Sequence, residues 1–171
     1  MTAAIFLTVF FAAHDDARPI IDSYLGSIDT PIGADRWRAL GPAAIPTLAA
    51  ISRDRGQLPS RRARALEGLA LAGGDAAAPV LVEVLARADE PPAVRAGALR
   101  GVGVVLDGAR LVAVVAPVMD GAADPHVRAA AAEVLATRAP REGCAPVRDR
   151  AARERPEWRL AYARALRACG D

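Results

Sequence analysis

Residues 92–99 read Pro-Ala-Val-Arg-Ala-Gly-Ala-Leu, and variants of this octapeptide recur three times elsewhere in the 171-residue chain. They begin at Pro59, Pro125 and Pro156, so successive prolines are 33, 33 and 31 residues apart. An arginine follows each proline by three positions and an aliphatic residue follows it by ten. Because proline is tolerated best in the first turn of an α-helix, each copy predicts a helix start. A period of this length is typical of a solenoid.

An apolar stretch precedes each of these predicted helices. In the first three copies it opens at Pro46, Pro79 and Val112, thirteen residues before the proline of the octapeptide. In the fourth copy we expect it to open at Pro146, after a shortened linker. Glycine tolerates the left-handed backbone that ends many helices, and glycines fall between the copies. They are Gly41, Gly73, Gly74, Gly108 and Gly143. The predicted unit is therefore helix, turn, helix, glycine.

With these features the chain resembles the HEAT-repeat family, including the phycobilisome-lyase-type HEAT-like repeats of bacteria. The resemblance rests on Leu40–Leu48 (Leu-Gly-Pro-Ala-Ala-Ile-Pro-Thr-Leu), Asp89–Arg95 (Asp-Glu-Pro-Pro-Ala-Val-Arg) and Asp124–Arg128 (Asp-Pro-His-Val-Arg), and it covers residues 41–171. It implies an all-α fold, a right-handed α-α superhelix of about four helical hairpins. The hairpins expected are 41–74, 75–108, 109–143 and 144–171.

The segment before the repeats follows a different pattern. Residues 14–40 are largely helical in character, with Pro19 at an expected helix start, but they do not fit the repeat. The terminal units of a solenoid must cover an exposed apolar end and are often atypical. We therefore expect residues 14–40 to form a helical N-terminal cap.

The first thirteen residues resemble a secretory signal peptide. Residues 3–13 are uncharged and apolar and end in small residues, but no basic residue precedes them. They are too short to span a bilayer, so we expect no transmembrane span. Export would make the protein periplasmic or secreted. The alternative is a first helix whose Ile5, Phe6, Val9 and Phe10 pack on the rest of a cytoplasmic protein.

The two cysteines stand near the two ends of the fourth hairpin. Cys144 lies near the start of its first helix and Cys169 near the end of its second. These two ends lie side by side in an antiparallel hairpin, so we predict a Cys144–Cys169 disulfide. Such a bond agrees with export, because disulfides persist in oxidising compartments. The alternative is two buried free cysteines.

One arginine recurs in every octapeptide, and two interpretations of it are open. The family resemblance implies a structural role, in which the stem packs between repeats and the head meets turn carboxylates or helix-end carbonyls. The alternative is a ladder that binds phosphate or carboxylate groups. The family often has an aspartate six positions before this arginine, but only Asp89 fits here, with Gly56 and Ala122 at the equivalent sites. The arginines are Arg62, Arg95, Arg128 and Arg159.

Five residues after each of these arginines comes another charged residue. The four alternate in sign, which is typical of a solvated face with weak ion pairs and argues against a polyanion on that face. They form a candidate interaction stripe. Its residues are Glu67, Arg100, Glu133 and Arg164.

Composition and motifs favour binding over catalysis. The net charge of +2 is too small for a dedicated nucleic-acid or anionic-membrane binder. Hydrolase, phosphate-loop and metal motifs are absent from the sequence, and His14 and His126 lack an evident catalytic partner. We expect no catalytic, cofactor-binding or metal-binding residues. The predicted function is a monomeric, non-catalytic protein-interaction or scaffold module; the resemblance implies one alternative, a bilin-lyase-like enzyme or accessory factor.

Overall fold

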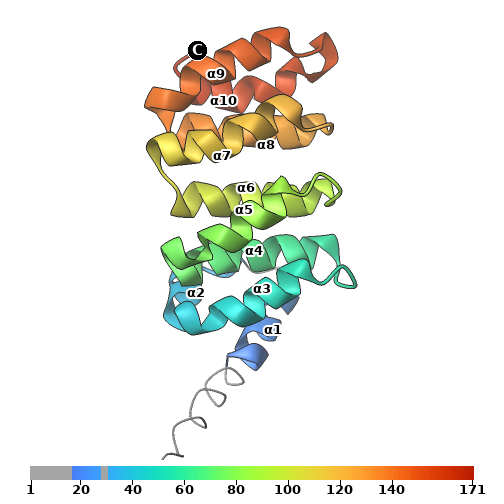
Figure 1. Ribbon diagram of the computed structural model, residues 1–171, viewed down its shortest axis with the longest axis vertical. Helices are drawn as coiled ribbons and strands as arrows, with labels where there is room; N and C mark the ends of the chain where they lie inside the picture. Colours follow the sequence, from blue (N-terminus) through green and yellow to red (C-terminus); the bar gives the residue numbers. More distant parts are fainter. Residues whose placement is uncertain (1–16, 28–30) are drawn as a thin grey trace, which may run out of the picture.

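A computed structural model describes residues 17–27 and 31–171. The signal-peptide-like segment 1–13 and His14 lie outside the described residues. Within the described ranges the chain forms α-helices and 3-10 helices, and no strand. Figure 1 shows these helices stacked in pairs along one long axis. The fold is thus the predicted all-α solenoid of helical hairpins.

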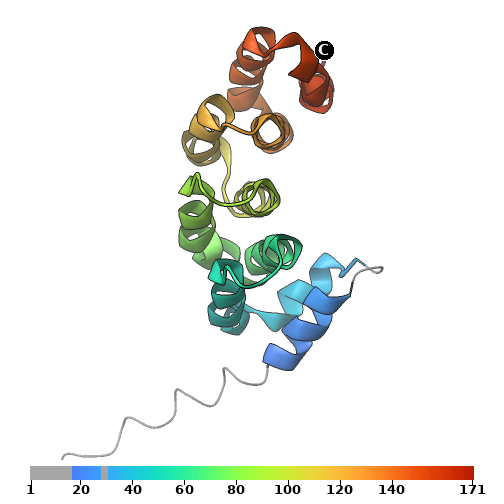
Figure 2. The ribbon, with the colours of Figure 1, turned by 90° about the vertical axis from the view of Figure 1, so that its right-hand side faces the viewer.

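The hairpins place their helices in two rows. The first helix of each hairpin belongs to what we call the outer row, which consists of α3 (Ile45–Arg53), α5 (Ala78–Ala86), α7 (Gly108–Gly121) and α9 (Pro140–Arg153). The second helices form the inner row, which consists of α4 (Pro59–Gly73), α6 (Pro92–Val105), α8 (Pro125–Arg138) and α10 (Ala163–Ala168). Figure 2 shows that the stack is curved and that the inner row lies on its concave side.

Proline and glycine set the ends of these helices. Pro59, Pro92 and Pro125 each begin an inner-row helix, as the octapeptide predicts. Gly41 and Gly74 have φ values of 62° and 50°, a left-handed region that favours glycine, and both stand between helices. Short 3-10 helices precede two outer helices and α10. They are η1 (Pro42–Ala44), η2 (Gly74–Ala77) and η3 (Pro156–Tyr162).

The fourth hairpin differs from the sequence prediction at its first helix. We expected this helix to start at Pro146 after a break at Gly143, but α9 already begins at Pro140 and contains both residues. Gly143 serves close packing instead, because a Cβ atom there would lie 2.8 Å from the carbonyl oxygen of Leu135 in α8. The prediction that Gly143 ends a helix is therefore wrong, and the chain turns at Ala139.

A continuous apolar core runs between the two rows. Its largest fully buried side chains come from every hairpin, and a buried leucine contributes about 1.5–3 kcal/mol relative to an exposed one. They include Leu48, Leu66, Leu69, Leu81, Leu85, Leu99, Leu111, Met119, Leu135 and Tyr162.

The N-terminal cap covers one end of this core. It consists of α1 (Arg18–Gly26) and α2 (Ala34–Leu40), and α2 packs on α4. Trp37 is buried against Gly68, where a Cβ atom would come within 2.7 Å of the indole ring. Tyr24 meets Trp37 edge-on, with 5.1 Å between ring centroids. An aromatic pair from the cap therefore packs against α4 of the first hairpin.

Among the described residues, Pro59–Ala86 is long and apolar enough to cross a membrane by length and composition alone. In the fold this stretch comprises three elements, α4, η2 and α5. It is not one continuous helix, because Gly74 has a left-handed backbone conformation and separates α4 from η2 and α5. Leu66, Leu69 and Leu81 within it are completely buried in the core. The stretch is thus a core segment of two hairpins and no clear membrane span.

Candidate functional site

A groove of about 460 Å³ lies on the inner row. All members of the predicted interaction stripe line it, and they come from four successive inner helices. The tertiary structure therefore brings the whole stripe, Glu67, Arg100, Glu133 and Arg164, to one surface.

The charges of the stripe pair with each other along the groove. Arg100 Nε donates to Glu67 Oε1 at 2.7 Å, and Arg164 Nη1 lies 3.9 Å from Glu133 Oε1. These side chains are largely exposed, so each pair contributes at most about 1 kcal/mol to stability. Little energy therefore holds these pairs in place.

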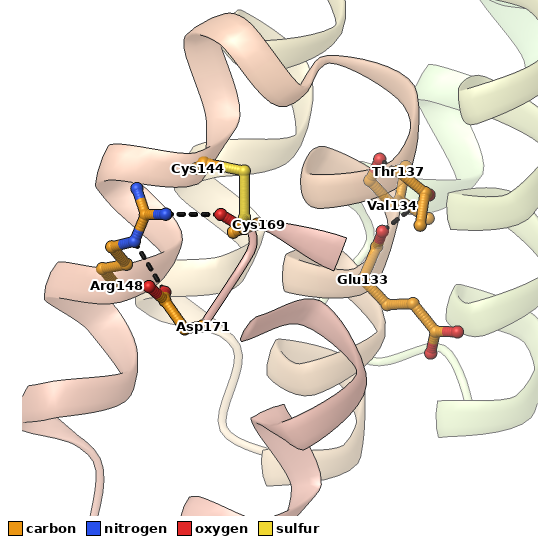
Figure 3. Close-up of a disulfide and its surroundings, with 7 residues drawn as sticks. All are labelled: Glu133, Val134, Thr137, Cys144, Arg148, Cys169 and Asp171. Carbon is orange, nitrogen blue, oxygen red and sulfur yellow. Dashed lines mark hydrogen bonds and ion pairs between the residues drawn. A yellow bond between two sulfur atoms is a disulfide. The ribbon is translucent and has the colours of Figure 1, made fainter. Parts of the chain in front are cut away.

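The floor of the groove is small and apolar. Gly101 and Gly103 of α6 line it together with Val104, which is 46% exposed. At Gly103 a Cβ atom would come within 2.9 Å of Val134, so α6 and α8 approach closely there. Thr137 donates its hydroxyl hydrogen to the carbonyl oxygen of Glu133 at 2.7 Å (Figure 3). The groove thus offers apolar contact along its floor and charged groups at its sides.

The repeated arginines do not line the inner groove, and they are not equivalent. Arg62 is 2% exposed, and its Nε donates to the carbonyl oxygen of Ser52 at 2.8 Å. Its Nη2 lies 2.7 Å from Glu90 Oε2, an ion pair without hydrogen-bond geometry. Arg55 and Arg87 each bring a nitrogen to within 3.8 Å of Glu90 Oε1. Arg62 therefore links the first hairpin to a carboxylate of the second.

Arg128 makes the same link between the third and fourth hairpins, to Glu154. Its Nε and Nη2 donate to the two carboxylate oxygens at 2.8 and 3.0 Å. Arg150, the Tyr162 hydroxyl and the backbone N–H of Arg155 also donate to this carboxylate, at 3.0, 3.1 and 3.1 Å. The hydrogen bond from Arg128 is the main cause that lowers the pKa of Glu154 to about 2. Burial raises the pKa of Tyr162.

The two remaining arginines have different surroundings. Arg159 is exposed, and its Nε donates to the carbonyl oxygen of Glu154 at 3.2 Å. Arg95 is 8% exposed, and its Nε is buried without a hydrogen-bond partner in residues 17–27 and 31–171.

The predictions from the sequence did not include the acceptors Glu90 and Glu154. Their shared place, two residues before Pro92 and Pro156, is a spacing signal that could have found them.

A disulfide joins Cys144 and Cys169, whose Cα atoms are 5.5 Å apart. Cys144 lies near the start of α9, and Cys169 caps the end of α10 (Figure 3). Arg148 donates to the carboxylate of Asp171 and to the carbonyl oxygen of Cys169, each at 2.6 Å. The disulfide therefore joins the two helices of the last hairpin at its open end.

His126 stands in the first turn of α8, where its ring meets Trp158 edge-on at 5.3 Å between centroids. Its backbone N–H donates to the capping carboxylate of Asp124 at 2.8 Å. No group of three or more His, Cys, Asp or Glu side chains that could hold a metal ion occurs in the described ranges. These surroundings give His126 a packing contact at a helix start.

Comparison with known proteins identifies the repeats. The family model for HEAT repeats matches residues 79–167, more than half of the chain. No curated protein and no solved structure matches the chain significantly. The matched description covers HEAT repeats in general and does not mention the lyase-type subgroup.

Proposed function

Because the chain belongs to the HEAT-repeat family, we propose that it is a non-catalytic interaction or scaffold module that binds a protein partner along its inner row. HEAT repeats generally mediate protein–protein interaction or scaffolding, and the family is generally non-enzymatic. Stacked repeats present an extended concave surface, which suits a polypeptide better than a small substrate. The step from fold to function is an analogy, so the site has to support it.

The observation that carries the proposal is the inner groove. It combines the partly exposed Val104 with weak, solvent-exposed ion pairs. A partner segment can bury the apolar floor and replace Glu67 or Arg100 as an ion-pair partner. Three arginines line the groove, and two of them, Arg100 and Arg164, have a glutamate beside them, which disfavours a polyanion. A polypeptide of mixed charge fits these features best.

Photo-crosslinking in the producing cell tests this proposal. A benzoylphenylalanine at position 137, in place of the exposed Thr137, should crosslink a partner from the inner groove. Val104→Asp should remove the crosslinked species, whereas Leu58→Asp should keep it, because Leu58 is 70% exposed in a turn away from the groove. The proposal fails if Val104→Asp has no effect, or if a probe at the outer-row Ala50 gives the same product.

We further propose that the protein works outside the cytoplasm as a monomer. Two features support export: the signal-peptide-like residues 3–13 and the Cys144–Cys169 disulfide, a bond that persists in oxidising compartments. Mass spectrometry on protein made from its native start should find the loss of about 13 residues and no alkylatable thiol. An intact Met1 with two alkylatable thiols would place the protein in the cytoplasm. Light scattering on the same sample measures the oligomeric state.

The bilin-lyase-like alternative has no specific contact in its support. It is tested separately, by mixing the purified protein with biliverdin and recording the absorption spectrum. An unchanged spectrum agrees with an interaction module, whereas a red-shifted, saturable band would favour the lyase-like function.

A further inference from the structure

Arg95 of α6 is a mostly buried arginine that has no ion-pair partner in the described ranges. Only 8% of the residue is exposed, and its Nε is fully buried with no hydrogen-bond partner. Its side chain makes no hydrogen bond or ion pair with any residue in the described ranges. The buried Nε carries a desolvation cost, and the two terminal nitrogens, which are not among the fully buried atoms, have donors left for a partner.

The neighbouring hairpins show what that partner would be. Arg62 meets Glu90, which stands 28 residues later, and Arg128 meets Glu154, which stands 26 residues later. The position 28 residues after Arg95 is occupied by Ala123, two residues before Pro125. The junction between the second and third hairpins therefore has the arginine and lacks the carboxylate that completes it on either side.

Arg95 also lines an open groove on the outer row. Among the other repeated arginines, Arg159 lines a separate groove beside α9 and α10. The groove at Arg95 has a volume of about 440 Å³ and lies between α5 and α7 of the outer row. Apart from Arg95 its walls are apolar or small. They include Val82 and Leu85 of α5 and Val114, Pro117 and Val118 of α7. This surface is distinct from the inner groove, with which it shares no residue.

From these observations we propose that the outer groove binds a peptide segment of a protein partner that carries a glutamate or aspartate between apolar residues. The carboxylate of the segment pairs with Arg95 and supplies the acceptor that Ala123 does not. The guanidinium offers a planar set of N–H donors that matches a carboxylate. The apolar walls contact the flanking side chains and exclude water from the ion pair. This site is independent of the inner groove and of the function proposed for it.

Nuclear magnetic resonance on the full chain tests this site. The probe is a capped pentapeptide with one central glutamate between apolar residues, and the control peptide has glutamine in its place. The glutamate peptide should shift the amide signals of Val82, Val114 and Val118, and the glutamine peptide should bind at least about tenfold more weakly, as expected when one partner of a buried charge pair is removed.

The decisive variant adds to the chain itself the carboxylate that this junction lacks. Ala123→Glu places a carboxylate at the position of Glu90 and Glu154, so it should raise the midpoint of thermal unfolding and abolish the shifts caused by the peptide. Ala123→Gln is the matched control, and it should do neither. This pair avoids the risk that a substitution of Arg95 itself prevents folding.

Several results would overturn the proposal. They are an absence of shifts at millimolar peptide, equal binding of the glutamate and glutamine peptides, unchanged peptide binding in Ala123→Glu, and equal stability of Ala123→Glu and Ala123→Gln. Shifts confined to Val104 and its neighbours would also overturn it, while they would leave the function proposed for the inner groove intact.

Discussion

Glu154 Oε2 lies 2.8 Å from Arg128 Nε, so a carboxylate of the fourth hairpin is held by the inner helix of the third. The Tyr162 hydroxyl donates to the same oxygen at 3.1 Å. Because the interacting groups come from successive hairpins, this contact fixes the position of the last unit against the stack. Arg62 and Glu90 make the corresponding contact between the first two hairpins.

Loss of the Arg128 guanidinium should destabilise the fold strongly. Arg128→Met keeps much of the stem but leaves the carboxylate of Glu154, which is 4% exposed, without its main partner. We expect a loss of about 3 kcal/mol in the free energy of unfolding, measured by urea denaturation. Arg159→Met is the matched control, because Arg159 occupies the equivalent position on the surface and should cost less than about 1 kcal/mol. Equal losses in the two variants would contradict the cross-hairpin role of Arg128.

Stability should fall in acid because of Glu154. Its pKa is lowered from 4.5 to about 2 in the fold, chiefly by the hydrogen bond from Arg128. A lowered carboxyl pKa contributes stability that is fully present above the unfolded value and is lost as the pH falls toward the folded one. We expect a loss on the order of 2 kcal/mol between about pH 5 and pH 2, measured by urea denaturation at each pH. Glu154→Gln should be less stable at neutral pH and should show a flatter dependence over this window.

Removal of the disulfide should loosen the last hairpin. The bond closes a chain segment with a sequence separation of 25, which corresponds to about 3 kcal/mol in the chain-entropy model. The double variant Cys144→Ser, Cys169→Ser should therefore unfold at lower urea than the oxidised protein. Wild-type protein treated with reductant is the control and should match the double variant. An oxidised protein no more stable than its reduced form would show that the bond does not clamp the fold.

Gly97 should be intolerant of a side chain. A Cβ atom at this position of α6 would lie 2.7 Å from the carbonyl oxygen of Ala63 in α4, and a backbone group cannot move aside as a flexible side chain can. Gly97→Ala should cost about 1–3 kcal/mol by forcing the two helices apart. Gly121→Ala is the control, because a Cβ atom there meets nothing within 4 Å. Thermal unfolding of the two variants compares them; a neutral Gly97→Ala would mean that α4 and α6 can separate at little cost.

The repeat could be predicted from the sequence because its signals are local. Proline at a helix start and glycine with a left-handed backbone act through one or two residues, so Pro59, Pro92 and Gly74 can be interpreted without a tertiary structure. The prediction for Gly143 failed because its role is not local. That glycine permits contact with Leu135 of another helix, and the same residue type that ends a helix also allows two helices to approach.

The sequence by itself determined the helical unit, its period, the spacing that brings Cys144 near Cys169, and the alternating charges of the interaction stripe. Only the tertiary structure decided that this stripe lines one groove and that the four repeated arginines differ. The period makes Arg62, Arg95, Arg128 and Arg159 look alike, since it describes each unit alone. The carboxylate partners belong to the following hairpin. The stacked structure is therefore needed to see that Glu90 and Glu154 pair with these arginines and that Ala123 stands at the equivalent position without a carboxylate.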